Sequence, residues 1–261
     1  MSLVTIDARH SVLGRTNALA KLAATLVISV TLLLSIDPVS AGVSLVLTLL
    51  VLPFARLDPR QLWLRLWPIV IAALIAGAAT VLYGRPSGEI YLEWGVLRIS
   101  DGSIALAAAI VLRVLAIAVP SIVLFATTDP TDLADSLAQL AKLPARFVLG
   151  ALAGLRLVGL LIDDWRELAL ARRARGIADT GRLRRFLGQT FALFVLAIRR
   201  GTKLATAMEA RAFGAPIERT WARPSRLHAR DAALVAVAVG IAAASVTAAV
   251  WAGTWTFVFA L

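Results

Sequence analysis

Five long runs of apolar residues constrain this chain more than any other feature of its sequence. A helix needs about 20 mainly apolar residues to cross the hydrocarbon core of a bilayer. The runs that approach this length are Ala18–Ile36, Val39–Phe54, Trp67–Tyr83, Ile104–Ala126 and Ala232–Leu261. Only 16% of the residues are charged, against roughly 25% in soluble domains. The sequence therefore predicts an all-α membrane protein with about five transmembrane helices and excludes a soluble enzyme.

The positive charge gathers in one part of the chain. Of the formal net charge of +11, most comes from residues 127–230, which hold 18 Lys and Arg against 9 Asp and Glu. Basic loops mark the cytoplasmic side of a membrane protein. We therefore expect a membrane domain over residues 1–126 with four transmembrane helices, a cytoplasmic insert over residues 127–230, and a final transmembrane helix over residues 231–261. This arrangement places the N-terminus in the cytoplasm.

Residues 148–162 are the ambiguous part of the insert. They are apolar enough to cross the bilayer, since Arg156 is their only charge. A crossing there would carry the later basic residues outside, against the rule for basic loops. We therefore expect residues 148–162 to lie at the membrane interface or under the transmembrane helices.

The insert has the pattern of three amphipathic helices. Asp129-Pro130 predicts the start of the first, because Asp caps a helix and Pro suits its first turn. The second is expected to run through Asp163-Asp164-Trp165 to Arg175 with Gly176 ending it, and the acidic pair is interpreted as the cap of a helix start. The third is expected from about Leu183 to Phe213-Gly214.

Two weaker patterns concern the membrane domain. Small residues recur at four-residue spacing in the last run, and such a stripe favours close helix packing. They are Ala232, Ala236, Gly240, Ala244, Ala248 and Ala252. Residues 91–97 are too few to span and are interpreted as a small hairpin or an interfacial segment.

Several chemistries have no residues to carry them. Cysteine is absent and the two histidines, His10 and His228, are far apart in the sequence. None of the three lysines follows a glycine, so the chain has no phosphate-binding P-loop. Arg113 in the fourth predicted span is the one clear intramembrane charge, and we interpret it as structural rather than as a gating residue. We predict no catalytic residues, no metal site and no cofactor.

Two arginines at predicted helix ends are the most informative residues. They lie in Ala174-Arg175-Gly176 and Ala210-Arg211-Ala212, 36 residues apart. An arginine there can compensate the negative end of the helix dipole. It can equally offer a bidentate fork to a carboxylate on another protein. The residues alone leave both roles open.

With these two triplets, the Lys-containing first helix and the Thr128–Leu133 segment, the chain resembles the transmembrane T component of energy-coupling factor (ECF) transporters. The resemblance covers nearly the whole chain. It implies that residues 127–230 are coupling helices, and that both triplets, Ala174, Arg175, Gly176 and Ala210, Arg211, Ala212, dock in grooves of two ABC ATPase subunits. The family often has glycine where Ala212 stands.

The resemblance also implies the remaining partners. The apolar side of the third insert helix, with Phe191, Phe194 and Ile198, would support a separate substrate-binding membrane subunit, the S component. The complex would import a vitamin or a transition-metal ion across the cell membrane of a prokaryote, and this multi-pass chain would be non-catalytic. Lipid is an expected partner and nucleic acid is not. The alternative is a self-sufficient secondary transporter.

Overall fold

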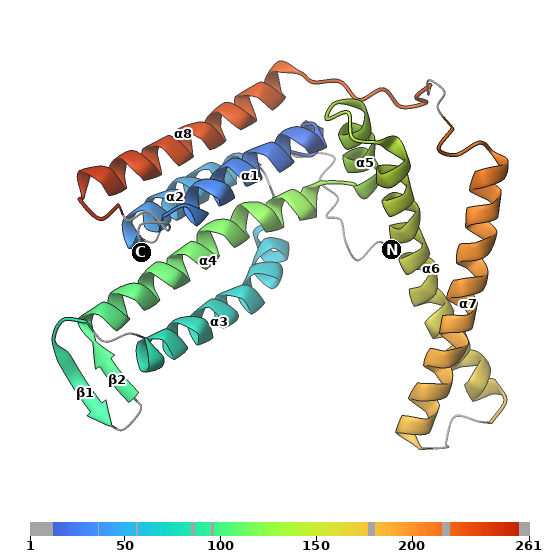
Figure 1. Ribbon diagram of the computed structural model, residues 1–261, viewed down its shortest axis with the longest axis horizontal. Helices are drawn as coiled ribbons and strands as arrows, with labels where there is room; N and C mark the ends of the chain where they lie inside the picture. The colour runs from blue at the N-terminus through green and yellow to red at the C-terminus, as the bar shows by residue number, and fades with distance from the viewer. Residues whose placement is uncertain are drawn as a thin grey trace. The chain divides into compact units, whose positions relative to one another are not determined.

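The computed structural model describes residues 13–35, 37–55, 57–84, 87–94, 97–176, 181–215 and 220–255. Over these ranges the protein is helical apart from one hairpin (Figure 1). The antiparallel strands of the hairpin are β1 (Ile90–Trp94) and β2 (Leu97–Ser100). The α-helices are α1 (Ala18–Leu33), α2 (Pro38–Val51), α3 (Pro59–Tyr83), α4 (Asp101–Thr127), α5 (Pro130–Gln139), α6 (Ala145–Ala174), α7 (Arg182–Ala210) and α8 (Ala229–Trp251). Short 3-10 helices cover Leu13–Arg15 and Leu52–Ala55.

Three of these helices, α2, α3 and α5, start at an Asp-Pro dipeptide. Asp37, Asp58 and Asp129 each accept a hydrogen bond from a backbone N–H two or three residues further on, at 2.6, 3.1 and 2.7 Å. The proline that follows loses no intrahelical bond, because the first-turn N–H groups have no partner within the helix. The predicted start of the first insert helix at Asp129-Pro130 is confirmed.

The predicted apolar runs correspond to α1, α2, α3, α4 and α8. Of these, α3, α4 and α8 are long and apolar enough to cross a membrane, whereas α1 and α2 are shorter apolar helices. The all-α membrane fold is confirmed. The last helix is shorter than the expected 231–261 segment, because Gly253 at φ 66° turns the chain off the axis after Trp251.

The chain divides into two compact units, residues 1–133 with 225–261, and residues 134–224. In the first unit α4 packs against α1, α2 and α3, and α8 packs against α1 and α2 (Figure 1). Its core is rich in alanine, which lets the helix backbones approach closely. The central cluster is Ala24, Ile28, Leu32, Ala41, Ala116, Ala238 and Ile241.

The small-residue stripe predicted on α8 is not the side that packs. Ala232, Ala236 and Gly240 are exposed in the described part of the protein. The buried side of α8 is Asp231, Ala238, Ile241, Ala242, Ser245 and Ala249. Alanine and glycine occur on every side of this helix, so their spacing did not identify the contact face.

In the second unit, α6 is one continuous helix of 30 residues from Ala145 to Ala174. The expected helix start at Asp163-Asp164 was therefore wrong: both residues lie in the middle of α6. No proline interrupts residues 145–174, so nothing forces a break. By length and composition α6 is itself a candidate span; the interfacial position of residues 148–162 stays a prediction.

Candidate coupling site

The helices α6 and α7 run antiparallel and cross one another (Figure 1). Near the crossing, Arg200 Nη2 on α7 donates a hydrogen bond of 2.7 Å to Asp164 Oδ1 on α6. The Asp164 side chain is 9% exposed and that of Arg200 is 38% exposed. The Asp164 carboxylate is therefore largely sheltered from water while Arg200 is not, and the ion pair joins the two helices at a defined point.

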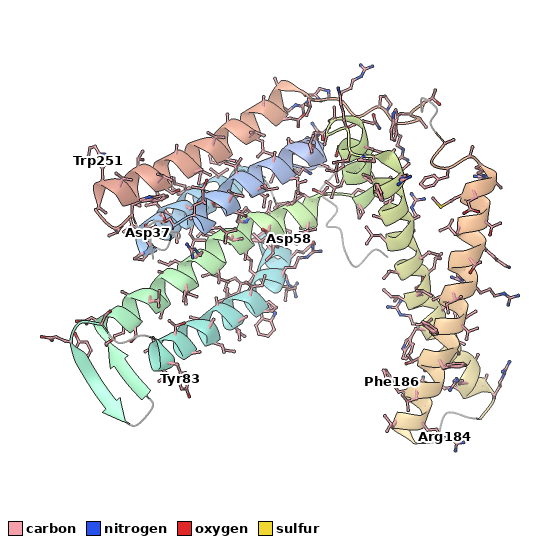
Figure 2. The ribbon with its side chains drawn as sticks, in the orientation of Figure 1. Asp37, Asp58, Tyr83, Arg184, Phe186 and Trp251 are labelled. Carbon is pink, nitrogen blue, oxygen red and sulfur yellow. The ribbon has the colours of Figure 1, made fainter. Side chains whose placement is uncertain are left out.

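Further contacts join the C-terminal half of α6 to the N-terminal half of α7. Gln189 Nε2 donates to the Trp165 carbonyl at 2.7 Å, and Arg172 Nη2 donates to the Gly188 carbonyl at 2.9 Å. A Cβ at Gly188 would stand only 3.2 Å from the Arg172 guanidinium, so glycine permits this approach. The rings of Trp165 and Phe186 pack edge to face, with centroids 5.8 Å apart; Figure 2 labels Phe186 on α7.

The ends of α6 and α7 have the same backbone conformation. Arg175 follows the last helical residue of α6 at φ −87° and ψ 4°. Arg211 holds the same place after α7 at φ −96° and ψ 18°. The next residues, Gly176 at φ 70° and Ala212 at φ 55°, both adopt the left-handed conformation. Glycine adopts this conformation at no steric cost, whereas alanine adopts it only at an energetic cost because of its Cβ.

Hydrogen bonds explain why Ala212 tolerates that conformation. The Ala212 N–H donates to the Glu209 carbonyl at 2.9 Å, and the Phe213 N–H donates to the Met208 carbonyl at 3.0 Å. Together they form a Schellman motif, which satisfies carbonyls that the helix end leaves without partners. At the end of α6 the Gly176 N–H makes the corresponding bond to the Arg173 carbonyl at 3.0 Å. Both turns place an arginine at the tip of a helix.

Both tips are accessible. All six residues of the two triplets are exposed. Among the described residues, neither the Arg175 nor the Arg211 guanidinium has a hydrogen-bond partner, whereas Arg172 donates to the Gly188 carbonyl and Arg200 to the Asp164 carboxylate. Because α7 has 29 residues, it is about 44 Å long. Arg175 lies near its start and Arg211 at its end, so the two arginines are separated by roughly the length of that helix.

One side of α7 presents large apolar side chains that nothing in the described part of the protein covers. Phe191, Phe194 and Ile198 are 69%, 61% and 54% exposed. Leu183 and Leu187 continue the same row toward the start of the helix and are also exposed. An uncovered apolar row of this length is typical of a surface that meets lipid or another protein.

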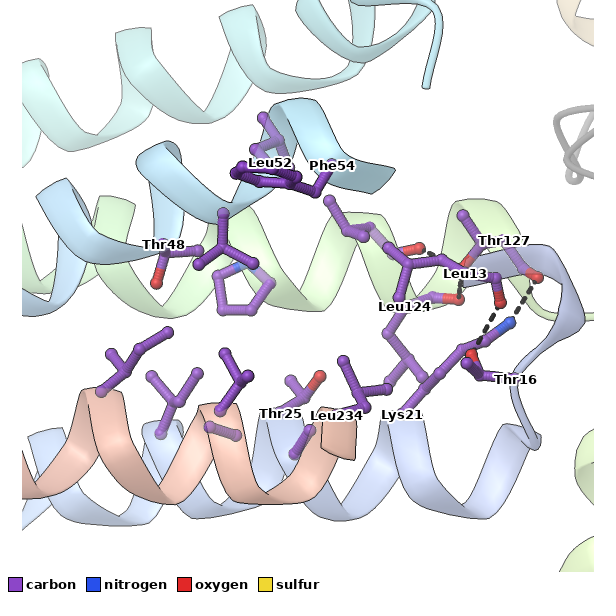
Figure 3. A pocket seen from close by; sticks show the side chains of 18 of the residues that line it. Leu13, Thr16, Lys21, Thr25, Thr48, Leu52, Phe54, Leu124, Thr127 and Leu234 are labelled. Carbon is purple, nitrogen blue, oxygen red and sulfur yellow. Dashed lines mark hydrogen bonds between the residues drawn. The ribbon is translucent and has the colours of Figure 1, made fainter. Parts of the chain in front are cut away.

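Polar residues join the starts of α1 and α8 to the end of α4 in the first unit. The buried Asp231 carboxylate accepts from the backbone N–H groups of Asn17 at 2.6 Å and His228 at 2.7 Å. Lys21 Nζ donates to the Thr127 carbonyl at 2.9 Å (Figure 3). These bonds fix the end of α4, from which the chain continues into α5 and α6.

The sequence pattern indicated both arginine triplets but not the residues that hold the helices together. Asp164 has the residue type of a helix cap, and no local pattern indicates a role for Arg200 or Asp231. The charge of Asp164 and Arg200 could have indicated their pairing, because a charged residue that is buried between amphipathic helices needs a partner. The two residues lie 36 positions apart, however, so no short sequence pattern joins them.

These features define a class of protein: a multi-pass, all-helical membrane protein that carries a crossed pair of helices with an exposed arginine at each end. The sequence profile of the family described as cobalt transport protein, CbiQ, matches residues 9–220. The chain belongs to this family, and with its similarity to the proteins below it is a transmembrane T component of the energy-coupling factor type.

Several named proteins are similar to the chain. The energy-coupling factor transporter transmembrane protein EcfT of Limosilactobacillus fermentum is 30% identical over 201 residues, which cover 70% of this chain and 75% of that protein. EcfT of Staphylococcus aureus is 27% identical over 74% of this chain and 77% of its own length. A Bifidobacterium longum protein named as an ABC transporter ATP-binding protein is 26% identical over 88% of this chain and 31% of its own length.

Proposed function

We propose that this chain is the non-catalytic coupling subunit of an importer of the energy-coupling factor type. Two ABC ATPase subunits bind ATP and close, and their motion reaches the membrane through α6 and α7. The observation that carries the proposal is the matched pair of helix ends, each with an exposed arginine followed by a left-handed small residue. The names of the similar transporter subunits and of the ATP-binding protein support it.

The proposed contact is an arginine fork on a carboxylate. A guanidinium presents a planar set of donors that matches a carboxylate in two parallel bonds. Gly176 and Ala212 carry at most a methyl group, so an ATPase groove can approach the backbone beside each arginine. A separation of about 44 Å along α7 suits two sites on two subunits better than one shared site.

We further propose that the apolar row with Phe191, Phe194 and Ile198 supports the S component, which binds the imported vitamin or transition-metal ion. The N-terminus and residues 127–230 then lie in the cytoplasm, and the complex lies in the cell membrane of a prokaryote. The α6–α7 pair supports this assignment, because the exposed arginine tips and the exposed apolar side of α7 are separate surfaces.

The test is co-purification of the ATPase subunits with tagged variants of the full chain. Truncating one partner of a desolvated interfacial ion pair costs about 2–5 kcal/mol, which is at least about 30-fold in affinity. We expect Arg175→Glu or Arg211→Glu to weaken ATPase binding by at least that factor, and the double variant to abolish it.

The matched control is Arg199→Glu, because Arg199 is an exposed arginine in the middle of α7, away from both tips. It should retain the ATPases. If the double variant keeps them, or if Arg199→Glu loses them equally, the assignment of the tips is wrong. Uptake by the chain alone in proteoliposomes would instead support the self-sufficient secondary transporter.

A further inference from the structure

The first unit contains a cavity of about 330 Å³. Residues of α1, α4 and α8, the end of α2 and the 3-10 helix after it line this cavity, and most of its wall is carbon (Figure 3). Typical small-molecule sites have volumes of about 300–1,000 Å³. The space is therefore large enough for a ligand, and its wall favours an apolar one.

The charged residues of the wall are both basic and lie at one end. Lys21 is in the first turn of α1 and Arg230 is in the first turn of α8. In Figure 3 the polar ends of Lys21, Thr16 and Thr127 lie together, away from Thr48 at the other end. Lys21 is 5% exposed and its Nζ donates to the Thr127 carbonyl, whereas Arg230 is exposed. The cavity thus combines an apolar interior with a cationic end.

The depth of the cavity matches one leaflet of a bilayer. Its wall extends along α8 from Arg230 to Ile241, a rise of about 16 Å at 1.5 Å per residue. Half of the hydrocarbon core is about 15 Å. The basic residues occupy the ends of their helices, where headgroups lie, and the apolar wall continues from there toward the middle of the membrane.

We propose that this cavity binds one anionic phospholipid, with its phosphate at Arg230 and Lys21 and an acyl chain along α8. The charge of the wall selects the headgroup, because each basic residue near an anionic lipid surface contributes about five-fold in affinity, the equivalent of about 1 kcal/mol. One acyl chain of the lipid enters the space between α1, α4 and α8, and the rest of the molecule lies in the bilayer. This inference does not depend on the coupling function of α6 and α7.

The test is native mass spectrometry of the purified full chain, titrated in detergent with dioleoylphosphatidylglycerol and, separately, with dioleoylphosphatidylcholine. We expect one tightly bound phosphatidylglycerol, held at least about five-fold more strongly than phosphatidylcholine. Arg230→Gln should weaken phosphatidylglycerol about five-fold and phosphatidylcholine less, because the choline cation neutralises the charge of its phosphate. The control is Arg226→Gln, since Arg226 is exposed but does not line the cavity; it should change neither lipid.

A second pair of variants tests the cavity itself. Ala233 lines the cavity near its basic end, whereas the adjacent Ala232 does not. Ala233→Trp should displace the bound lipid, and Ala232→Trp should retain it; gel filtration checks that both variants are folded. Equal binding of the two lipids, or lipid binding that Arg230→Gln and Ala233→Trp leave unchanged, would overturn the proposal.

Discussion

The Asp164–Arg200 ion pair allows an asymmetric prediction, because its two partners differ in exposure. The Asp164 side chain is 9% exposed, the Arg200 side chain is 38% exposed, and their atoms are 2.7 Å apart. The second carboxylate oxygen of Asp164 is buried and has no hydrogen-bond partner among the described residues. Arg200→Gln therefore leaves a buried carboxylate without its cation, whereas Asp164→Asn leaves an arginine that water can reach.

The magnitudes follow from this difference. Removing one partner of a fully buried pair costs about 3–5 kcal/mol, whereas exposed pairs contribute about 0–1 kcal/mol. Since this pair is sheltered on one side only, we expect Arg200→Gln to destabilise the crossing by about 2–3 kcal/mol and Asp164→Asn by about 1 kcal/mol. In the double variant two neutral amides face each other, so the cost should fall below that of Arg200→Gln alone.

Amide hydrogen exchange of α6 and α7 measures these costs, because separation of the helices exposes both to local unfolding. Exchange over residues 160–170 and 195–205 should accelerate about 30- to 150-fold in Arg200→Gln and about five-fold in Asp164→Asn, at ten-fold per 1.4 kcal/mol. Arg199→Gln changes a neighbouring exposed arginine and should have no effect. Equal acceleration in the two single variants, or the reverse order, would refute the argument.

Two further predictions concern the left-handed residues after α6 and α7 and the apolar row of α7. A left-handed alanine costs about 1–2 kcal/mol, and the greater freedom of glycine in the unfolded chain offsets about 0.4–1 kcal/mol of that cost. Ala212→Gly should therefore slow amide exchange in the last turn of α7 about two- to five-fold, and Gly176→Ala should accelerate it at the end of α6; the opposite signs would contradict the observed φ values. Phe191→Glu with Phe194→Glu should release the S component in the co-purification assay and retain the ATPases, whereas loss of both would contradict separate surfaces.

The sequence alone determined the features that depend on a few neighbouring residues or on the thickness of a bilayer. Apolar runs located the apolar helices α1, α2, α3, α4 and α8, and Asp129-Pro130 and Gly176 located helix ends, because capping bonds join residues only a few positions apart. The arginine triplets were found in the same way. The sequence did not indicate the left-handed conformation of Ala212, because the Schellman hydrogen bonds stabilise this conformation and the residue type does not favour it.

Only the tertiary structure decided which side of each helix is in contact. On α8 the expected stripe through Ala236 and Gly240 is exposed, and the side through Ala238 and Ala242 is buried. Because alanine occurs on every side of α8, the local sequence does not distinguish the two faces. Asp164 had the residue type of a helix cap, yet it pairs with Arg200, 36 residues away, inside a continuous helix. Such pairings follow from how the helices pack, and no local rule contains that information.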